Sequence, residues 1–371
     1  GAWQILERSD LDVAVLETAR GGLVLRGMGY ESNDASVLTN VSSDHLDLQG
    51  IHTLPELAEV KSTVARATRE GGWAVLNADD PLVGAVARRV RAKVALFSIG
   101  GARGAAAVRR IVAGGGRGYV LRDGWLMELD GPDHEHRIIE VERVPITLGG
   151  LARHNVANAL AAAGAARGLG VTLAQLRDGL ADFQPSSERS PGRLNLFRLG
   201  SRIVIVDFAH NEAGVSAVLD VAEGIAGGAA GRAAPITAIV GTAGDRPDDT
   251  LRGIGKIAGH RAQRVAIKET LKYLRGRSRE STVGEILAGI RSSGRATGDV
   301  TVYESETAAL RGELARSDGA SRPDSPRVIV LMCHEEREEV FALLAELGAR
   351  PVDIATELTT LIPRMQTRPR R

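Results

Sequence analysis

The chain has 371 residues, of which 43% are hydrophobic and 25% charged, and its formal net charge is +1. This balance gives no reason to expect a nucleic acid or a membrane surface as a partner. The single cysteine, Cys333, excludes an intrachain disulfide and a Cys-rich zinc site. No uncharged apolar run reaches the roughly 18 residues of a membrane span, and no signal pattern opens the chain. We therefore expect a soluble, cytoplasmic protein and leave a homo-oligomer open.

Short apolar runs alternate with helical patterns along the first half of the chain, which is typical of an α/β fold with a mostly parallel sheet. The expected strands cover residues 11–17, 35–39, 73–76 and 94–97. Between them, a helix is expected over 54–67, because Thr53 is a plausible cap and Glu56 follows three residues later. A second helix is expected to begin at Pro81, since proline favours the first helical position.

Residues 101–147 interrupt this alternation, because they are rich in Gly and Arg and carry β-prone fragments. We expect a small antiparallel insertion there, followed by an Ala-rich helix over 154–169. The polar, turn-rich stretch 183–192 is the best linker candidate. A second α/β alternation follows, with strands expected at 203–208, 236–240, 265–267, 300–303 and 328–332.

Polar residues stand at the expected carboxyl ends of the first two strands, where open α/β sheets bind ligands. Glu17 ends the first strand, and His45 follows the second, flanked by Asp44 and Asp47. An imidazole beside carboxylates suits a divalent cation, and carboxylates suit Mg²⁺. A solvated strand-end glutamate, a capping aspartate and a surface histidine explain the same residues, so these patterns alone leave both interpretations open.

Three further positions in this half are candidates for binding. Lys61 lies within an expected helix, where a solvated surface lysine is the simpler interpretation, and Asn77 lies between a strand and a helix. His154 and Asn158 share one helix face, with Asn155 beside them. Asparagine amides offer paired donor and acceptor atoms that match the edge of an adenine ring. Because asparagine is a poor helix former, a ligand or capping role is favoured here.

In the second half, candidate residues gather around the linker and the first strand. Arg193 lies in a Pro-Gly-Arg turn, from which its guanidinium could bind a phosphate. Asp207 ends the first strand and could hold a ribose hydroxyl, and His210 and Asn211 follow at the same edge.

Taken in order, these motifs resemble those of the Mur ligase superfamily, and most closely the Mur-ligase-like C-terminal part of the cyanophycin synthetases. The strings similar to the central ATPase domain are ETARGG at 17–22, TNVSSDHL at 39–46, LAEVKS at 57–62, LNADDP at 76–81 and HNVANALAA at 154–162. Those similar to the C-terminal domain are PGRLNLF at 191–197, DFAHN at 207–211, VGTAGDR at 240–246 and LRGR at 274–277. The resemblance covers nearly the whole chain.

The resemblance implies a fold of two domains. A Mur ligase central domain, with a mostly parallel sheet, helices and a small antiparallel insertion, would cover 1–188. A Rossmann-like C-terminal domain would cover 189–362, and a basic tail would follow over 363–371.

The resemblance also implies a reaction, in which a carboxylate takes the γ-phosphoryl group of ATP and an amino-acid amine then displaces phosphate from the acyl phosphate. ATP and Mg²⁺ would be the cofactors. The partners would be an amino acid and a carboxylate acceptor, for which a polypeptide-like polymer is one candidate. Glu17 and His45 would bind Mg²⁺, and Lys61 would be the lysine that family members carbamoylate. Arg193 would contact a phosphate, and the remaining nucleotide contacts would be Asn77, His154, Asn155, Asn158, Asp207, His210 and Asn211.

The sequence departs from the family pattern at the phosphate-binding loop. It contains no G-x-x-x-x-G-K-[ST] string, and its one Gly-Lys pair, Gly255-Lys256, is followed by Ile257. Since the family's loop precedes the ETARGG string, we expect the chain to lack an N-terminal part. The alternative is a nucleotide-binding pseudo-ligase without turnover. A NAD-dependent enzyme is a more distant alternative, because no G-x-G-x-x-G string opens a helix in either half.

A second departure lies ahead of LRGR. Residues 268–273 read Lys-Glu-Thr-Leu-Lys-Tyr where acidic residues are expected in cyanophycin synthetases. A guanidinium substrate needs carboxylate partners, and Lys272 would repel it although Glu269 is retained. The sequence therefore argues against arginine as the added amino acid.

Overall fold

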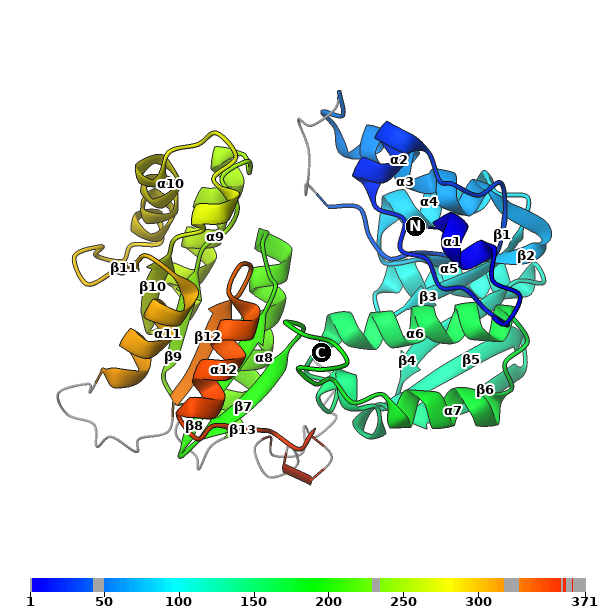
Figure 1. The fold of residues 1–371 in the computed structure, drawn as a ribbon. Helices are drawn as coiled ribbons and strands as arrows, with labels where there is room; N and C mark the ends of the chain where they lie inside the picture. The colour runs from blue at the N-terminus through cyan, green and yellow to red at the C-terminus, as the bar shows by residue number, and fades with distance from the viewer. Residues whose placement is uncertain are drawn as a thin grey trace. The chain divides into compact units, whose positions relative to one another are not determined.

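A computed structural model describes residues 2–42, 50–228, 234–316, 327–354, 356–357 and 362 (Figure 1). The chain divides into two compact units, residues 1–182 and 183–371. The first contains a six-stranded sheet and the second a seven-stranded sheet, each flanked by helices. The predicted α/β fold class is confirmed. Among the described residues, no helix is both long and apolar enough to span a bilayer.

The sheet of the first unit has the strand order β1-β2-β3-β4-β5-β6. Neighbours from β1 to β4 pair in parallel, whereas β4, β5 and β6 pair antiparallel. The strands are β1 (Asn33–Leu38), β2 (Thr68–Asn77), β3 (Lys93–Ser98), β4 (Arg117–Arg122), β5 (Trp125–Gly131) and β6 (His134–Glu140). The expected strands at 35–39, 73–76 and 94–97 are thus confirmed as β1, β2 and β3.

Helices cover both faces of this sheet. The helices of this unit are α1 (Ala2–Leu6), α2 (Arg20–Arg26), α3 (Leu54–Arg66), α4 (Pro81–Ala85), α5 (Ala102–Ala113), α6 (Arg153–Gly168) and α7 (Leu173–Asp182). Ala74 and Leu76 of β2 belong to the core cluster on the side of α3, α4 and α5, whereas Val75 between them belongs to the cluster beneath α6. This alternation is the period-two pattern of a strand buried on both faces.

The start of α3 matches the expected capping box. The Oγ1 atom of Thr53 accepts from the backbone N–H of Glu56 at 3.3 Å, and the Glu56 carboxylate accepts from the Thr53 N–H at 3.0 Å. The helices expected at Pro81 and over 154–169 are also present, as α4 and α6.

Thr53→Ala is expected to lower the free energy of unfolding by about 1 kcal/mol, because the Glu56 N–H group at the start of α3 loses its hydroxyl acceptor. Thr53→Ser keeps the hydroxyl and serves as the matched control. Urea denaturation followed by circular dichroism measures both changes. A Thr53→Ala midpoint equal to that of wild type would contradict the capping role.

Two expectations for this unit are wrong. Residues 11–17 form no strand: within the described part of the unit no ladder pairs them, and Val15 is 92% exposed. A short apolar run is not enough for a strand without a neighbour that satisfies its backbone groups. Glu17 therefore does not end a strand.

The second error concerns the start of the expected insertion at 101–147. Its first part is the helix α5, which joins the parallel strands β3 and β4, so that only β4 to β6 are antiparallel. The glycines suggested a break in the helical pattern, but Gly104 is buried where a Cβ atom would collide with the Asp79 carboxylate. This glycine therefore permits close packing of the helix.

The sheet of the second unit has the order β11-β10-β9-β12-β8-β7-β13. Its strands are β7 (Asn195–Leu199), β8 (Arg202–Asp207), β9 (Ile236–Val240), β10 (Arg264–Lys268), β11 (Thr301–Tyr303), β12 (Arg327–Met332) and β13 (Arg350–Pro351). The five expected strands are confirmed as β8 to β12, and all run parallel. Strand β7 and the edge strand β13 were not anticipated; β7 pairs antiparallel with both β8 and β13.

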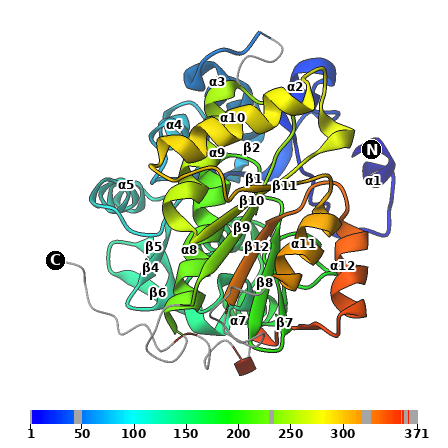
Figure 2. The same ribbon diagram turned by 90° about the vertical axis from the view of Figure 1, so that its left-hand side faces the viewer.

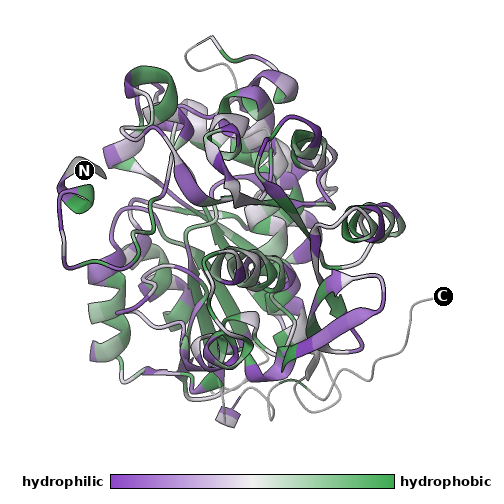
Figure 3. Cartoon of the chain, turned by 90° about the vertical axis from the view of Figure 1, so that its right-hand side faces the viewer, coloured by the Kyte–Doolittle hydropathy of each residue, from purple (hydrophilic) through white to green (hydrophobic). Residues whose placement is uncertain are grey.

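Helices also cover both faces of the second sheet (Figure 2). They are α8 (Glu212–Gly228), α9 (Asp248–Arg261), α10 (Arg279–Ser292), α11 (Glu306–Ala315) and α12 (Arg337–Glu346). Helices α8 and α9 lie on one face and α11 and α12 on the other, while α10 packs on α9. The strands in the middle of the view in Figure 3 are mostly coloured as hydrophobic.

The Gly255-Lys256 pair lies in the middle of α9, not in a phosphate-binding loop. A Cβ atom at Gly255 would collide with the Ile286 carbonyl oxygen of α10. Gly255 therefore permits the close approach of these two helices.

Candidate functional site

Two predicted residues of the first unit meet at the carboxyl end of β1. The Lys61 Nζ atom on α3 donates to the Asn40 carbonyl oxygen at 3.2 Å, and the Asn77 amide at the end of β2 donates to the Thr39 carbonyl oxygen at 2.7 Å. Both side chains thus reach the residues that directly follow β1. Carboxyl ends of neighbouring parallel strands share one edge, which is where open α/β sheets bind ligands.

The acidic residues after Asn77 stabilise this edge. Asp80 accepts from the backbone N–H groups of Leu82 and Val83 at the start of α4, and from that of Val41 at 2.7 Å. Asp79 accepts from the Ser98 hydroxyl at 2.7 Å and from a backbone N–H group of the β3 end. Their lone pairs are engaged in holding the loops after β1, β2 and β3 together.

The predicted magnesium ligands are described only in part. Glu17 is exposed in the extended segment before α2, and His45 lies with Asp44 and Asp47 outside the described residues. Where the chain is described, no three His, Cys, Asp or Glu side chains gather closely enough to hold a metal ion. The assignment of Glu17 and His45 therefore stays a prediction.

The predicted adenine contacts lie in the first turns of α6. The Asn155 amide donates to the Ile146 carbonyl oxygen at 2.9 Å, and the Asn158 amide donates to Asn155 Oδ1 at 3.2 Å. His154 is half-buried beside them, and Asn158 is exposed. Asn155 thus joins α6 to the turn before it, and Asn158 is the residue of the pair that faces solvent.

In the second unit, Asp207 and Arg193 lie around the end of β8. Asp207 is 8% exposed, and its Oδ2 atom accepts from the Leu194 N–H at 2.8 Å. Burial raises the pKa of Asp207, against the opposing effects of that N–H group and of the Arg193 charge. The Arg193 guanidinium lies over the Phe208 ring, 5.1 Å from its centre. The structure therefore brings these two predicted residues together.

His210 and Asn211 stabilise the loop after β8. The Nδ1 atom of His210 lies 3.0 Å from the Phe208 carbonyl oxygen, and the His210 carbonyl oxygen accepts from the Thr242 hydroxyl at 3.1 Å. The Asn211 Oδ1 atom accepts from the Gly214 N–H at 2.8 Å and so caps the start of α8. Both residues lie at the predicted edge of the sheet.

Sequence reasoning missed a buried ionic group at the same edge. The Lys268 Nζ atom, at the end of β10, lies 2.6 Å from Glu306 Oε1 and 2.7 Å from His334 Nδ1. Burial alone would raise the pKa of Glu306, but the charge and hydrogen bond of Lys268 outweigh it and lower that pKa to about 2. The available signal was the Cys-His-Glu-Glu string directly after β12, which also lies at a carboxyl end.

The other residues of the string 268–273 have internal roles or face solvent. The Glu269 carboxylate accepts from the Arg279 guanidinium, and Lys272 is exposed. The one carboxylate retained in this string is therefore already paired with an arginine of the chain.

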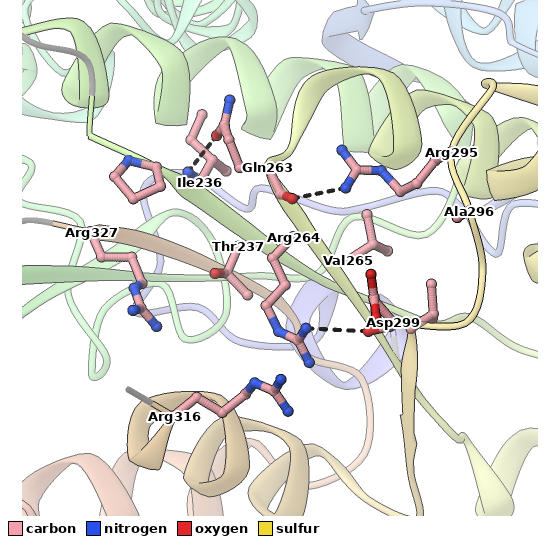
Figure 4. Close-up of a pocket in the computed structure, with 12 residues that line it drawn as sticks. Ile236, Thr237, Gln263, Arg264, Val265, Arg295, Ala296, Asp299, Arg316 and Arg327 are labelled. Atoms are coloured by element: carbon pink, nitrogen blue, oxygen red, sulfur yellow. Dashed lines mark hydrogen bonds between the residues drawn. The ribbon is translucent and has the colours of Figure 1, made fainter. Parts of the chain in front are cut away.

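A cavity of about 520 Å³ lies at the opposite edge of the second sheet, near the amino ends of β9, β10 and β12 (Figure 4). Its Arg264 is paired with the buried Glu313 carboxylate, and its Arg295 donates to the carbonyl oxygens of Gly259 and Gln263. These arginines stabilise the edge, and none of the predicted site residues lines the cavity.

Comparison with known proteins identifies the same family that these motifs resemble. Residues 3–166 match the model of the Mur ligase middle domain. The cyanophycin synthetase of Crocosphaera subtropica is 38% identical over 320 residues, which cover 85% of this chain and 35% of that protein. The cyanophycin synthetase of Synechocystis sp. is 40% identical over 286 residues, which cover 77% of this chain and 32% of that protein. The chain thus spans about a third of the length of these relatives.

A solved structure shows the same fold. It is the bifunctional folylpolyglutamate synthase/dihydrofolate synthase of Yersinia pestis complexed with AMPPNP and Mn ion, with a TM-score of 0.57 at 17% identity. The match covers 85% of this chain and 62% of that one. The middle-domain match and the cyanophycin synthetase relatives lead to one conclusion: the chain belongs to the Mur ligase superfamily.

Proposed function

We propose that the chain is part of an ATP-dependent amide ligase of the Mur and cyanophycin synthetase type. A carboxylate oxygen of the acceptor attacks the γ-phosphorus of ATP, the bond to ADP breaks, and an acyl phosphate forms. The amine lone pair of an amino acid then attacks the acyl carbon, inorganic phosphate leaves, and the amine loses a proton as the amide forms. Such catalysis consists mainly of positioning and charge neutralisation.

The observation that carries this proposal is the placement of Lys61. Its Nζ atom reaches from α3 to the Asn40 carbonyl oxygen at the carboxyl end of β1. A carbamate formed on this nitrogen would add a carboxylate to the ligand-binding edge, where Asn77 also lies. We assign Lys61 to this role.

The donors assigned to this role fit a magnesium ion by their chemistry, because a carbamate, a glutamate carboxylate (Glu17) and a histidine imidazole (His45) offer oxygen and nitrogen ligands. When bound, Mg²⁺ would neutralise charge on the ATP phosphates. In the first unit, Asn77, His154, Asn155 and Asn158 would bind the nucleotide. In the second, Arg193 would contact a phosphate, Asp207 would accept from a ribose hydroxyl, and His210 and Asn211 would hold the loop beside them.

We further propose that residues 1–188 form the central ATPase domain, that residues 189–362 form the C-terminal domain, and that 363–371 are a tail. The two compact units of the structure divide six residues earlier, at 182/183. The polar stretch from Phe183 onward therefore packs with the second unit.

Phosphate release by the full-length gene product tests the function. With ATP, Mg²⁺, an acceptor carboxylate and an amino acid, phosphate and amide product should form in equal amounts, and omission of the amino acid should suppress the amide. The second candidate, a nucleotide-binding protein without turnover, is favoured by the missing G-x-x-x-x-G-K-[ST] string. If calorimetry detects binding of ATP and Mg²⁺ but no amide forms under any of these conditions, the second candidate is the correct one.

Arginine is expected to be a poor substrate, with kcat/KM at least about tenfold below that of the best amino acid in a panel. The carboxylates of Glu269 and Asp245 are paired with Arg279 and Arg275, and Lys272 is exposed at the same edge. An incoming guanidinium must therefore compete with the chain's own arginines, a loss of about 1.4 kcal/mol or more. Amide formation should be measured with arginine, lysine, neutral and acidic amino acids. Arginine as the preferred substrate would contradict this prediction.

A further inference from the structure

A group of charged and polar side chains is buried at the carboxyl edge of the second sheet. Lys268 is 1% exposed and Glu306 fully buried, and the His334 side chain is 5% exposed. Lys268 ends β10, Glu306 begins α11, and His334 lies just after β12. Buried charges are rare unless they are paired, so a group this deep has a function in stability or in positioning.

Glu306 anchors the loop after β12. Its two carboxylate oxygens accept from the backbone N–H groups of His334 at 2.6 Å, Glu335 at 3.1 Å and Glu336 at 2.8 Å. The Cys333 Sγ–H group donates to Glu306 as well, at 3.0 Å. With the ammonium group of Lys268, this carboxylate has a full set of donors, and it fixes the backbone from which the His334 ring projects.

The hydrogen bonds of His334 determine its tautomer. An ammonium group can only donate, so Nδ1 of His334 must accept from Lys268 Nζ and carries no proton. Nε2 therefore carries the proton and donates to the Ala209 carbonyl oxygen at 3.0 Å. Burial, together with the charge of Lys268, lowers the pKa of His334 well below its ordinary value and favours this neutral ring.

The His334 ring contacts the loop that carries the candidate nucleotide residues. It meets the Phe208 ring edge-on, with 5.0 Å between the ring centres. The guanidinium groups of Arg193 and Arg337 lie 5.1 and 5.9 Å from the centre of the same Phe208 ring. His334 thus contacts Phe208 and Ala209, and Phe208 in turn supports Arg193.

We propose that His334 is a positioning residue of the nucleotide site: held by Lys268 and Glu306 as a neutral Nε2–H donor, it fixes Phe208 and Ala209, and through Phe208 it orients Arg193. This inference rests on the proposed function, because the nucleotide roles of Arg193 and Asp207 belong to that proposal. The geometry of His334 itself does not depend on it.

Two substitutions separate the ring contact of His334 from its hydrogen bonds. His334→Phe keeps a ring against Phe208 and removes both hydrogen bonds, whereas His334→Gln keeps a polar group and removes the ring. His260→Gln, in the exposed last turn of α9, is the matched control. Thermal unfolding identifies any variant that fails to fold, and either folded His334 variant is sufficient for the comparison.

The first measurement is by NMR on the full chain. Long-range proton–nitrogen spectra of the imidazoles, assigned with His334→Gln, should show an Nε2–H tautomer that does not titrate between about pH 5.5 and 8, around the ordinary histidine pKa. His334→Phe and His334→Gln should shift the resonances of Phe208, Ala209 and the Arg193 Nε–H group. An Nδ1–H tautomer, or shifts no larger than those of His260→Gln, would overturn the inference.

The second measurement is the affinity for ATP with Mg²⁺ by calorimetry. His334→Phe should weaken binding about tenfold, whereas His260→Gln should change it less than about twofold. Equal affinities of wild type and folded His334→Phe would also overturn the inference. If wild type binds no ATP, the nucleotide roles in the proposed function fail, and the NMR comparison still decides whether His334 positions the loop.

Discussion

Lys61→Met in the full-length gene product is expected to lower kcat by at least about a hundredfold without unfolding the protein. We propose that a carbamate on this nitrogen helps hold Mg²⁺, and charge stabilisation by a metal contributes several kcal/mol to phosphoryl transfer. Lys61→Arg should be equally inactive, because a guanidinium keeps the charge but does not form the carbamate. The initial rate of amide formation at saturating ATP measures the effect.

Lys256→Met is the matched control, since Lys256 is an exposed lysine on α9. Its rate should equal that of wild type. A hydrogen bond such as that from Lys61 Nζ to the Asn40 carbonyl oxygen contributes only about 1 kcal/mol to stability, so the variant is expected to fold. Glu17→Ala and His45→Ala should abolish turnover in the same assay. Activity of Lys61→Met within a few-fold of wild type would remove the lysine from the metal site.

The elements that sequence reasoning predicted well are those specified by local patterns. Strand β9 was predicted at its observed bounds, because four of the five residues of Ile236–Val240 are apolar, all but Thr237, and all five are buried as in a central parallel strand. The helix α3 was predicted from its capping box, whose two hydrogen bonds join residues only three positions apart. In both cases the local sequence pattern is sufficient to predict the element.

The errors arise where the outcome depends on a distant partner. Residues 11–17 carry the short apolar run of a buried strand, but in the described structure no neighbour pairs with them, and Val15 faces solvent. In the sequence, Gly104 suggests a break in the helical pattern. In the structure it leaves room for the Asp79 carboxylate, which comes from the loop after β2. Neither fact is available from the local pattern, because each depends on the tertiary arrangement.

The residues of the candidate site also divide into those that a local pattern predicts and those that depend on distant partners. The carboxyl-edge rule placed Asn77 and Asp207 at the ends of their strands, and both lie there. The buried group was missed because its members are 38 and 66 residues apart, from Lys268 to Glu306 and to His334. In the sequence, Lys268 was noted only as the first residue of the string 268–273, and no role was assigned to it. Its burial, which follows from the position of β10 between β9 and β11, assigns its charge to Glu306.

Lys268→Met is expected to lower the free energy of unfolding of the second unit by about 3–5 kcal/mol. The substitution keeps the volume of the buried stem but leaves the Glu306 carboxylate without its cation, and an uncompensated buried charge has a cost of this size. Urea denaturation at neutral pH, followed by fluorescence or circular dichroism, measures the shift in midpoint. Arg311→Met is the control on α11, because its pair with Glu346 is exposed and should contribute less than about 1 kcal/mol.

The double variant Lys268→Met/Glu306→Gln separates the charge from the packing. Removing both charges abolishes the electrostatic penalty, and the glutamine carbonyl oxygen can replace Oε2 as the acceptor for the N–H groups of Glu335 and Glu336. The double variant should therefore be more stable than Lys268→Met alone, with a coupling energy of at least about 2 kcal/mol in the double-mutant cycle. Additive losses would show that Lys268 and Glu306 contribute independently. In that case the stability of this edge would come from the packing of the two side chains, and their ion pair would not be what holds His334 in place.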